Sequence, residues 1–131
     1  MNFQNAVGEW MHACFGAAIS SDRQERAFRF GEEALELLQA LDCTREEAVA
    51  LVEYVWARPK GESQQEVGGV MVTLAALCNA QPTRTSMDEC GVRELERCWG
   101  KIDKIRAKHA AKPVGVRTAL PGDPRAAGGG E

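Results

Sequence analysis

The sequence predicts an all-α protein, a bundle of four or five helices with short connections. Three observations support this fold class. Apolar residues recur three and four positions apart through most of the chain, which is the spacing of one helix face. Hydroxyl and carboxylate residues stand where helices would begin, as N-caps do. No segment alternates apolar and polar residues in the manner of a strand, so a helical bundle is expected.

The first two helices are predicted from apolar residues that share one face. The first is expected from about Phe3 to Phe15, and Gly16 should end it. Residues 20–22, Ser-Ser-Asp, offer cap oxygens for a second helix that runs to about Leu41. The apolar stripe of this second helix comprises Ala27, Phe30, Ala34, Leu37, Leu38 and Leu41.

Thr44 and Glu47 have capping-box spacing, so a third helix should begin there and run through Trp56. Pro59 then ends it, because proline disfavours helical geometry in the residue before it. A fourth helix is expected from about Ser63 to Asn79. It is apolar on most sides, which predicts the central, buried helix of the bundle.

A fifth helix is predicted from the cap at Ser86 to about Lys112, with an interruption at Gly91. Residues 1–112 would then form a single helical domain. Residues 113–131 are rich in Gly, Pro and Ala and contain almost no large apolar residue. Such a segment buries too little surface to offset its ordering entropy, so a flexible, disordered tail is expected.

Composition narrows the function classes. The net charge of −3 argues against a general nucleic-acid binder, which would have a basic bias. The five cysteines are an odd number without a C-x-x-C pair, which predicts free thiols in a reducing cytoplasm. No export signal is recognised, and the longest low-polarity run, Val67–Cys78, is shorter than the roughly 20 residues that span a bilayer. We therefore expect a cytoplasmic protein with neither nucleic acid nor membrane as a partner.

Three glutamates in the second helix, Glu32, Glu33 and Glu36, are the main functional signal. Carboxylates three or four positions apart lie on one side of a helix and repel each other by a few tenths of a kcal/mol per pair. A hard cation such as Mg²⁺ would turn that repulsion into binding. The alternative interpretation is an ordinary solvated face, since such spacings are common in helical proteins.

A fourth glutamate, Glu66, opens the fourth helix, where an unpaired buried carboxylate would be costly. Gly68 and Gly69 follow it, and each costs about 1 kcal/mol relative to alanine inside a helix. Such glycines indicate a packing or site reason, for example a close approach of another backbone.

These residues resemble the signature of the all-α nucleotide pyrophosphohydrolases, EExxE on one helix and ExxD on a later apolar helix. That group comprises MazG-type enzymes, dimeric dUTPases and phosphoribosyl-ATP pyrophosphohydrolase, and this chain looks like a small MazG-like member. Glu32-Glu33-x-x-Glu36 matches the first half. Glu66-Val67-Gly68-Gly69 matches the second half, except that Gly69 stands where the family has Asp. The resemblance covers residues 22–112.

The resemblance implies a chemistry and a set of roles. Family members cleave nucleoside triphosphates between the α and β phosphates, with Mg²⁺ bridging phosphate oxygens and positioning a water; Mn²⁺ is an alternative ion. The carry-over makes Glu32 and Glu33 catalytic residues, and it makes Glu33, Glu36 and Glu66 metal ligands. Lys101 and Lys104 would bind substrate phosphates, although lysines near a helix C-terminus also complement its dipole. The family also implies a homodimer or homotetramer.

Gly69 leaves several outcomes open. The site could bind fewer metal ions, or water could fill the missing coordination position, which Mg²⁺ tolerates. Asp22, Asp103 or a carboxylate of another subunit could replace the missing ligand. A further interpretation is a catalytically degenerate binding or interaction module on the same fold.

The remaining residues have simpler interpretations. Arg29 precedes Glu33 by four positions, which predicts a salt bridge between them. His12 is expected to be a packing or surface residue, and His109 a surface residue. The three tryptophans fall on apolar stripes and are expected in the core: Trp10, Trp56 and Trp99.

Overall fold

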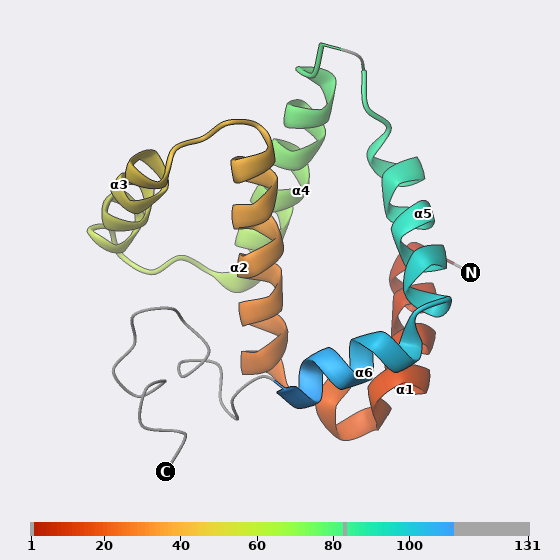
Figure 1. Ribbon diagram of the computed structural model, residues 1–131. Helices are drawn as coiled ribbons and strands as arrows, with labels where there is room; N and C mark the ends of the chain where they lie inside the picture. Colours follow the sequence, from red (N-terminus) through yellow and green to blue (C-terminus); the bar gives the residue numbers. More distant parts are fainter. Residues whose placement is uncertain (1, 83, 112–131) are drawn as a thin grey trace. The chain divides into compact units, whose positions relative to one another are not determined.

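The computed structural model describes residues 2–82 and 84–111, and these residues form six helices without a strand (Figure 1). The all-α prediction is confirmed, with six helices in place of four or five. Lys112 and the predicted tail at 113–131 lie outside the described residues. No helix in the described ranges is long and apolar enough to cross a membrane. The helices are α1 (Phe3–Ser20), α2 (Arg23–Ala40), α3 (Arg45–Trp56), α4 (Ser63–Asn79), α5 (Met87–Trp99) and α6 (Ile102–Ala111).

The N-terminal ends of the helices follow local capping chemistry. Asn2 Oδ1 accepts from the backbone N–H of Asn5 at the start of α1, at 2.8 Å. Asp22 Oδ1 accepts from the N–H of Glu25 at 3.2 Å and caps α2. Each side chain satisfies a donor that the first helical turn leaves without an intrahelical partner.

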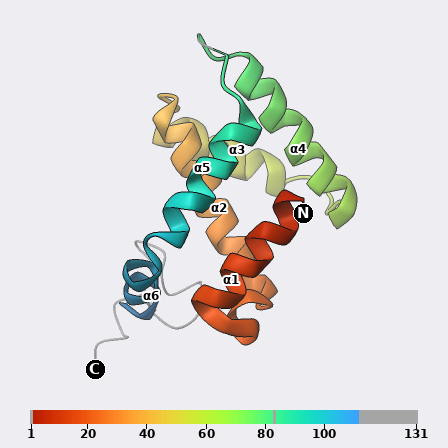
Figure 2. The ribbon, with the colours of Figure 1, turned by 90° about the vertical axis from the view of Figure 1, so that its right-hand side faces the viewer.

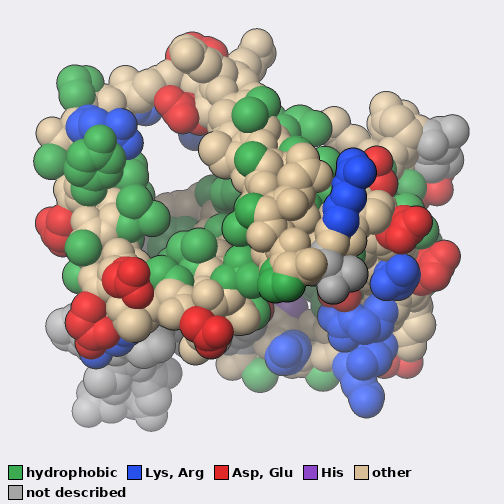
Figure 3. Space-filling view, turned by 90° about the horizontal axis from the view of Figure 1, so that it is seen from above, with side chains coloured by type: hydrophobic (Ala, Val, Ile, Leu, Met, Phe, Trp, Pro, Cys, Tyr) green, Lys and Arg blue, Asp and Glu red, His purple; other side chains and the backbone are tan. Residues whose placement is uncertain are grey.

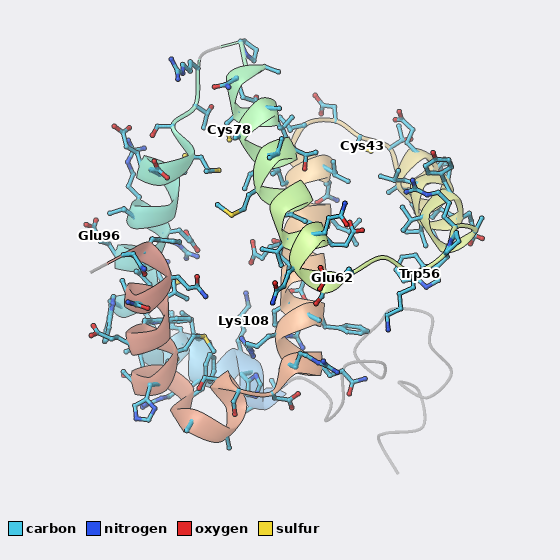
Figure 4. All side chains as sticks on the ribbon, turned by 180° about the vertical axis from the view of Figure 1, so that it is seen from behind. Cys43, Trp56, Glu62, Cys78, Glu96 and Lys108 are labelled. Carbon is cyan, nitrogen blue, oxygen red and sulfur yellow. The ribbon has the colours of Figure 1, made fainter. Side chains whose placement is uncertain are left out.

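The capping box predicted for α3 is present in both directions. Thr44 Oγ1 accepts from the Glu47 N–H at 3.1 Å, and the Glu47 carboxylate accepts from the Thr44 N–H at 2.9 Å. At α4 the cap is Glu62, whose carboxylate accepts from the N–H groups of Gln64 and Gln65 (Figure 4).

Two glycines break helices, and only one of them was expected to do so. Gly16 has φ 78° and ψ 172° inside α1, so the predicted break is confirmed as a kink. Positive φ favours glycine because it carries no Cβ. The second break is at Gly100 and Lys101, between α5 and α6, and the prediction of an interruption at Gly91 was wrong. Gly91 lies inside α5, where glycine weakens a helix without ending it.

The chain divides into two units. The first unit comprises residues 1–34 and 94–131, and the second comprises residues 35–93. Helix α2 begins in the first unit and ends in the second.

In the first unit α6 packs against α1, as two perpendicular views show (Figures 1 and 2). Met11 and Cys14 of α1 are buried, and because they are three positions apart they lie on one side of the helix. Trp10 meets the Phe15 ring edge-on, with the ring centroids 6.0 Å apart. Phe15 also contacts His109 of α6, with the ring centroids 5.1 Å apart, so His109, which was predicted at the surface, packs against α1 while its side chain stays 31% exposed.

Arg106 of α6 donates to two backbone carbonyls of α1. Its guanidinium lies 2.6 Å from the Cys14 oxygen and 2.7 Å from the Ala13 oxygen. Because Gly16 breaks the helix just after these residues, their carbonyls lack the usual intrahelical donors. A cation at a helix C-terminus also complements the helix dipole, so this contact fastens α6 to α1.

In the second unit the apolar side chains are open, and the prediction of a buried α4 was wrong. Within this unit, none of the described helices packs against another. An apolar sequence can create a buried helix only where another element covers it. Hydrophobic side chains on the surface are visible in Figure 3. Exposed large apolar residues of α3 and α4 are Val49, Leu51, Val52, Tyr54, Val55, Trp56, Val67, Val70, Met71 and Val72.

The core prediction for two of the tryptophans was also wrong. Trp56 is 78% exposed at the end of α3, and Trp99 is 45% exposed at the end of α5 (Figure 4). A position at the last residue of a helix leaves little neighbouring structure to cover the ring.

Candidate functional site

The three motif glutamates of α2, Glu32, Glu33 and Glu36, are all exposed. Glu32 and Glu33 belong to the first unit, and Glu36 belongs to the second. Because α2 is one continuous helix, Glu33 and Glu36 share a side one turn apart.

Arg29 pairs with two carboxylates. Its Nε lies 2.8 Å from Oε1 of Glu25, and its Nη1 lies 2.7 Å from Oε2 of Glu32. Burial acts to lower the pKa of Arg29, but the hydrogen bonds and charges of Glu25 and Glu32 outweigh it and raise that pKa. The sequence predicted a salt bridge between Arg29 and Glu33. In the structure Arg29 forms salt bridges with Glu25 and Glu32.

Glu33 has a basic neighbour at the end of α5. Arg97 forms an ion pair with Glu94, and this hydrogen bond is the main reason that the pKa of Arg97 is raised. The charge of Glu33 adds to the same rise, so Glu33 lies within electrostatic reach of Arg97. The charge of Lys101 in turn contributes to lowering the pKa of Glu94, behind the larger effect of Arg97. Acidic and basic side chains therefore interact electrostatically with one another in this part of the first unit.

Glu66 occupies the first turn of α4 in the second unit, and it is exposed, not buried as expected. Its carboxylate lies over Gly61, where a Cβ on residue 61 would overlap with Glu66 Oε1. At Gly68 and Gly69 an added Cβ would meet nothing within 4 Å. The close backbone approach predicted for these two glycines is therefore absent from the described chain.

The two lysines assigned to substrate are both exposed. Lys101 precedes α6, and its carbonyl accepts the first hydrogen bond of that helix, from the Ile105 N–H at 2.9 Å. Lys104 lies in the first turn and a half of α6. Asp103 also lies in the first turn of α6, whereas Asp22 is occupied as the cap of α2.

Exposed carboxylates are the ligand type that Mg²⁺ favours, and Glu33, Glu36 and Glu66 are all exposed. Because Gly61 has no side chain, the Glu66 carboxylate can lie beside it, and a side chain at position 61 would displace that carboxylate. Among residues 2–82 and 84–111, no three His, Cys, Asp or Glu side chains are grouped closely enough to hold a metal ion.

Comparison of the chain with protein-family models, curated proteins and solved structures found no match.

The sequence did not single out Glu25, and it did not predict the contacts that join Glu25 to other residues. Glu25, Arg29 and Glu32 form a connected set on α2, and His109 approaches Glu25 from α6 with Nδ1 3.8 Å from Oε1. The spacing of Glu25, Arg29 and Glu32 could have indicated the first three. The role of His109 had no such signal, because it depends on how α6 packs.

Proposed function

We propose that this chain is a Mg²⁺-dependent nucleoside triphosphate pyrophosphohydrolase of MazG-like type. It would convert NTP or dNTP to the nucleoside monophosphate and pyrophosphate. Glu33, Glu36 and Glu66 would bind the metal, with Mn²⁺ as an alternative ion. Glu32 and Glu33 would act in the activation of water, and Lys101 and Lys104 would bind phosphate oxygens.

One observation carries this proposal: carboxylates with the family's EExxE spacing lie exposed on a continuous helix, and a further carboxylate begins α4. The match of Glu33, Glu36 and Glu66 to the motif positions supports the proposal over an ordinary solvated face. The substrate would be a nucleotide bound through metal and phosphate, because both carboxylates and lysines suit that chemistry.

The first prediction concerns catalysis itself. We expect the purified protein to release pyrophosphate from at least one nucleoside triphosphate when Mg²⁺ or Mn²⁺ is present. Glu36→Gln should lower kcat at least about a hundredfold, since loss of a metal ligand removes transition-state stabilisation. The measurement is a pyrophosphate assay over canonical and modified nucleotides, with circular dichroism to confirm that the variant is folded.

Glu46→Gln is the matched control, because it removes an exposed carboxylate from α3, outside the motif. It should leave kcat unchanged. A wild type that releases no pyrophosphate from any nucleotide, and whose melting temperature does not respond to Mg²⁺ with nucleotide, would contradict the proposal.

A second function rests on Gly69. The missing family carboxylate favours a catalytically degenerate module that binds a nucleotide or a protein without cleaving it. Binding of a nucleotide without release of pyrophosphate would support this alternative.

The proposal includes an assembly and a compartment. Open apolar faces on α3 and α4 support a homodimer or homotetramer, because large exposed apolar patches mark interaction sites. All five cysteines are free, which is compatible with the cytoplasm as the proposed compartment.

A further inference from the structure

Arg29 joins a half-buried carboxylate to an exposed one on the same helix. It reaches back four positions to Glu25 and forward three positions to Glu32, at 2.8 and 2.7 Å. A guanidinium is planar and holds its N–H donors in a fixed fork. Once Nε is bound to Glu25, the direction of Nη1 toward Glu32 is therefore restricted.

The Glu25 end of this bridge is the anchored one. Its side chain is 13% exposed, and its carboxylate lies 3.8 Å from Nδ1 of His109 and 3.8 Å from Nη2 of Arg26. His109 in turn contacts the Phe15 ring of α1. Residues of α1, α2 and α6 thus meet around Glu25.

The Glu32 end is the exposed one, with 46% of its side chain accessible. A glutamate side chain has several staggered rotamers available, and the hydrogen bond from Arg29 favours one that brings Oε2 to Nη1. Arg29 therefore links the well-covered carboxylate of Glu25 to the carboxylate of Glu32, which is the first residue of the motif.

We propose that Arg29 is a positioning residue, which holds the Glu32 carboxylate in the orientation that the site uses, with Glu25 as its anchor. The catalytic part of this inference rests on the proposed function, whereas the orientation of Glu32 is a property of the chain alone. Partners behind a site commonly matter this way, and removing one costs about 10- to 100-fold in activity or metal affinity.

The test is Arg29→Lys, which keeps the positive charge and loses the fork. Lysine is a point charge on a flexible stem and cannot hold two carboxylates in one geometry. We expect kcat for pyrophosphate release to fall about tenfold, with KM changed less than about twofold. Glu25→Gln should reproduce part of the effect, because it weakens the anchoring hydrogen bond by removing the charge of its acceptor and leaves Arg29 in place.

Arg93→Lys is the matched control. Arg93 pairs with Glu89 on α5, where both side chains are more than two-thirds exposed, at 75% and 71%. Exposed pairs of this kind contribute little, so this variant should retain the wild-type kcat. If Arg29→Lys lowers only the melting temperature and leaves kcat unchanged, Arg29 is structural and the inference fails.

A second readout requires no turnover. In protein labelled with ¹³C at the glutamate carboxyl carbon, the Glu32 signal is identified by its loss in Glu32→Gln. It should shift in Arg29→Lys and Glu25→Gln at constant pH, and it should stay in place in Arg93→Lys.

The two readouts separate the two proposals. A wild type that cleaves no nucleotide contradicts the proposed function, and the carboxyl signal then decides the role of Arg29 by itself. An unshifted Glu32 signal in Arg29→Lys overturns the positioning role whether or not the protein is active.

Discussion

Gly69 is the residue on which the functional interpretation depends most. An aspartate there would complete the ExxD half of the signature that the chain resembles, and among the described residues nothing lies within 4 Å of a Cβ at this position. Packing within the chain thus gives no reason for glycine.

Gly69→Asp distinguishes an active site from a degenerate module. Stability should change by less than about 0.5 kcal/mol, because the gain in helix propensity offsets repulsion from Glu66 one turn away. If the wild type is active, we expect lower pyrophosphate release, since an added charge disturbs a site that works with fewer carboxylates. Gly68→Asp is the matched control, with equal space and a different direction around the helix. An inert wild type that gains activity through Gly69→Asp supports the degenerate module.

At the scale of single elements, helices α1 to α5 each begin at a side chain that accepts a hydrogen bond from a backbone N–H of the first turn. The α3 capping box shows this most fully, with Thr44 and Glu47 bonded in both directions. The backbone and side-chain hydrogen bonds with Thr44 lower the pKa of Glu47 below its usual value of 4.5. The ionised carboxylate is therefore the form that the folded helix prefers.

The sign of the pH dependence follows from that shift. A carboxyl whose pKa is lower in the folded state stabilises the fold above its unfolded pKa, and this stabilisation is lost as the pH falls through the folded pKa. Glu47→Gln should therefore destabilise α3 at pH 7, and its difference from the wild type should shrink below about pH 4.5. Thr44→Ala should cost about 1 kcal/mol at pH 7. Urea unfolding followed by circular dichroism measures both. Glu53→Gln, near the other end of α3, is the control. If the difference in unfolding free energy between the wild type and Glu47→Gln is the same at pH 7 and pH 3, the cap assignment is contradicted.

At the scale of the whole molecule, the exposed apolar faces of the second unit predict that another protein surface binds to them. Val72 is 70% exposed on α4, and its neighbours Val70 and Met71 are exposed as well. Soluble chains rarely leave such a patch uncovered, so we expect another subunit to cover it.

Light scattering after size exclusion tests this expectation. The wild type should have a mass at least twice the 14.3 kDa of the chain. Val72→Lys should shift it toward the monomer, because a buried lysine at an interface is costly. Gln65→Lys, which adds the same charge at an exposed polar position of α4, should not. A monomeric wild type would show that no second copy covers this face.

Local chemistry explains which parts of the fold could be predicted from the sequence. The bounds of α3 and α4, the cap at Thr44 and the break at Gly16 depend on residues within one turn, and these predictions are confirmed. The break at Gly100 was missed because two glycines of the same helical segment look alike locally. The EExxE spacing likewise places Glu33 and Glu36 on one side of α2 without any tertiary information.

The sequence by itself determined the bounds of α3 and α4, the capping box of α3 and the identity of the carboxylates, because hydrogen bonds within one turn and helical periodicity depend on near neighbours. Only the tertiary structure decided what those side chains meet. It gave Arg29 to Glu25 and Glu32, placed His109 against Phe15, fastened α6 to α1 through Arg106, and left α4 uncovered. These outcomes join residues that are distant in the chain or choose among several reachable partners, and helical periodicity does not contain that information.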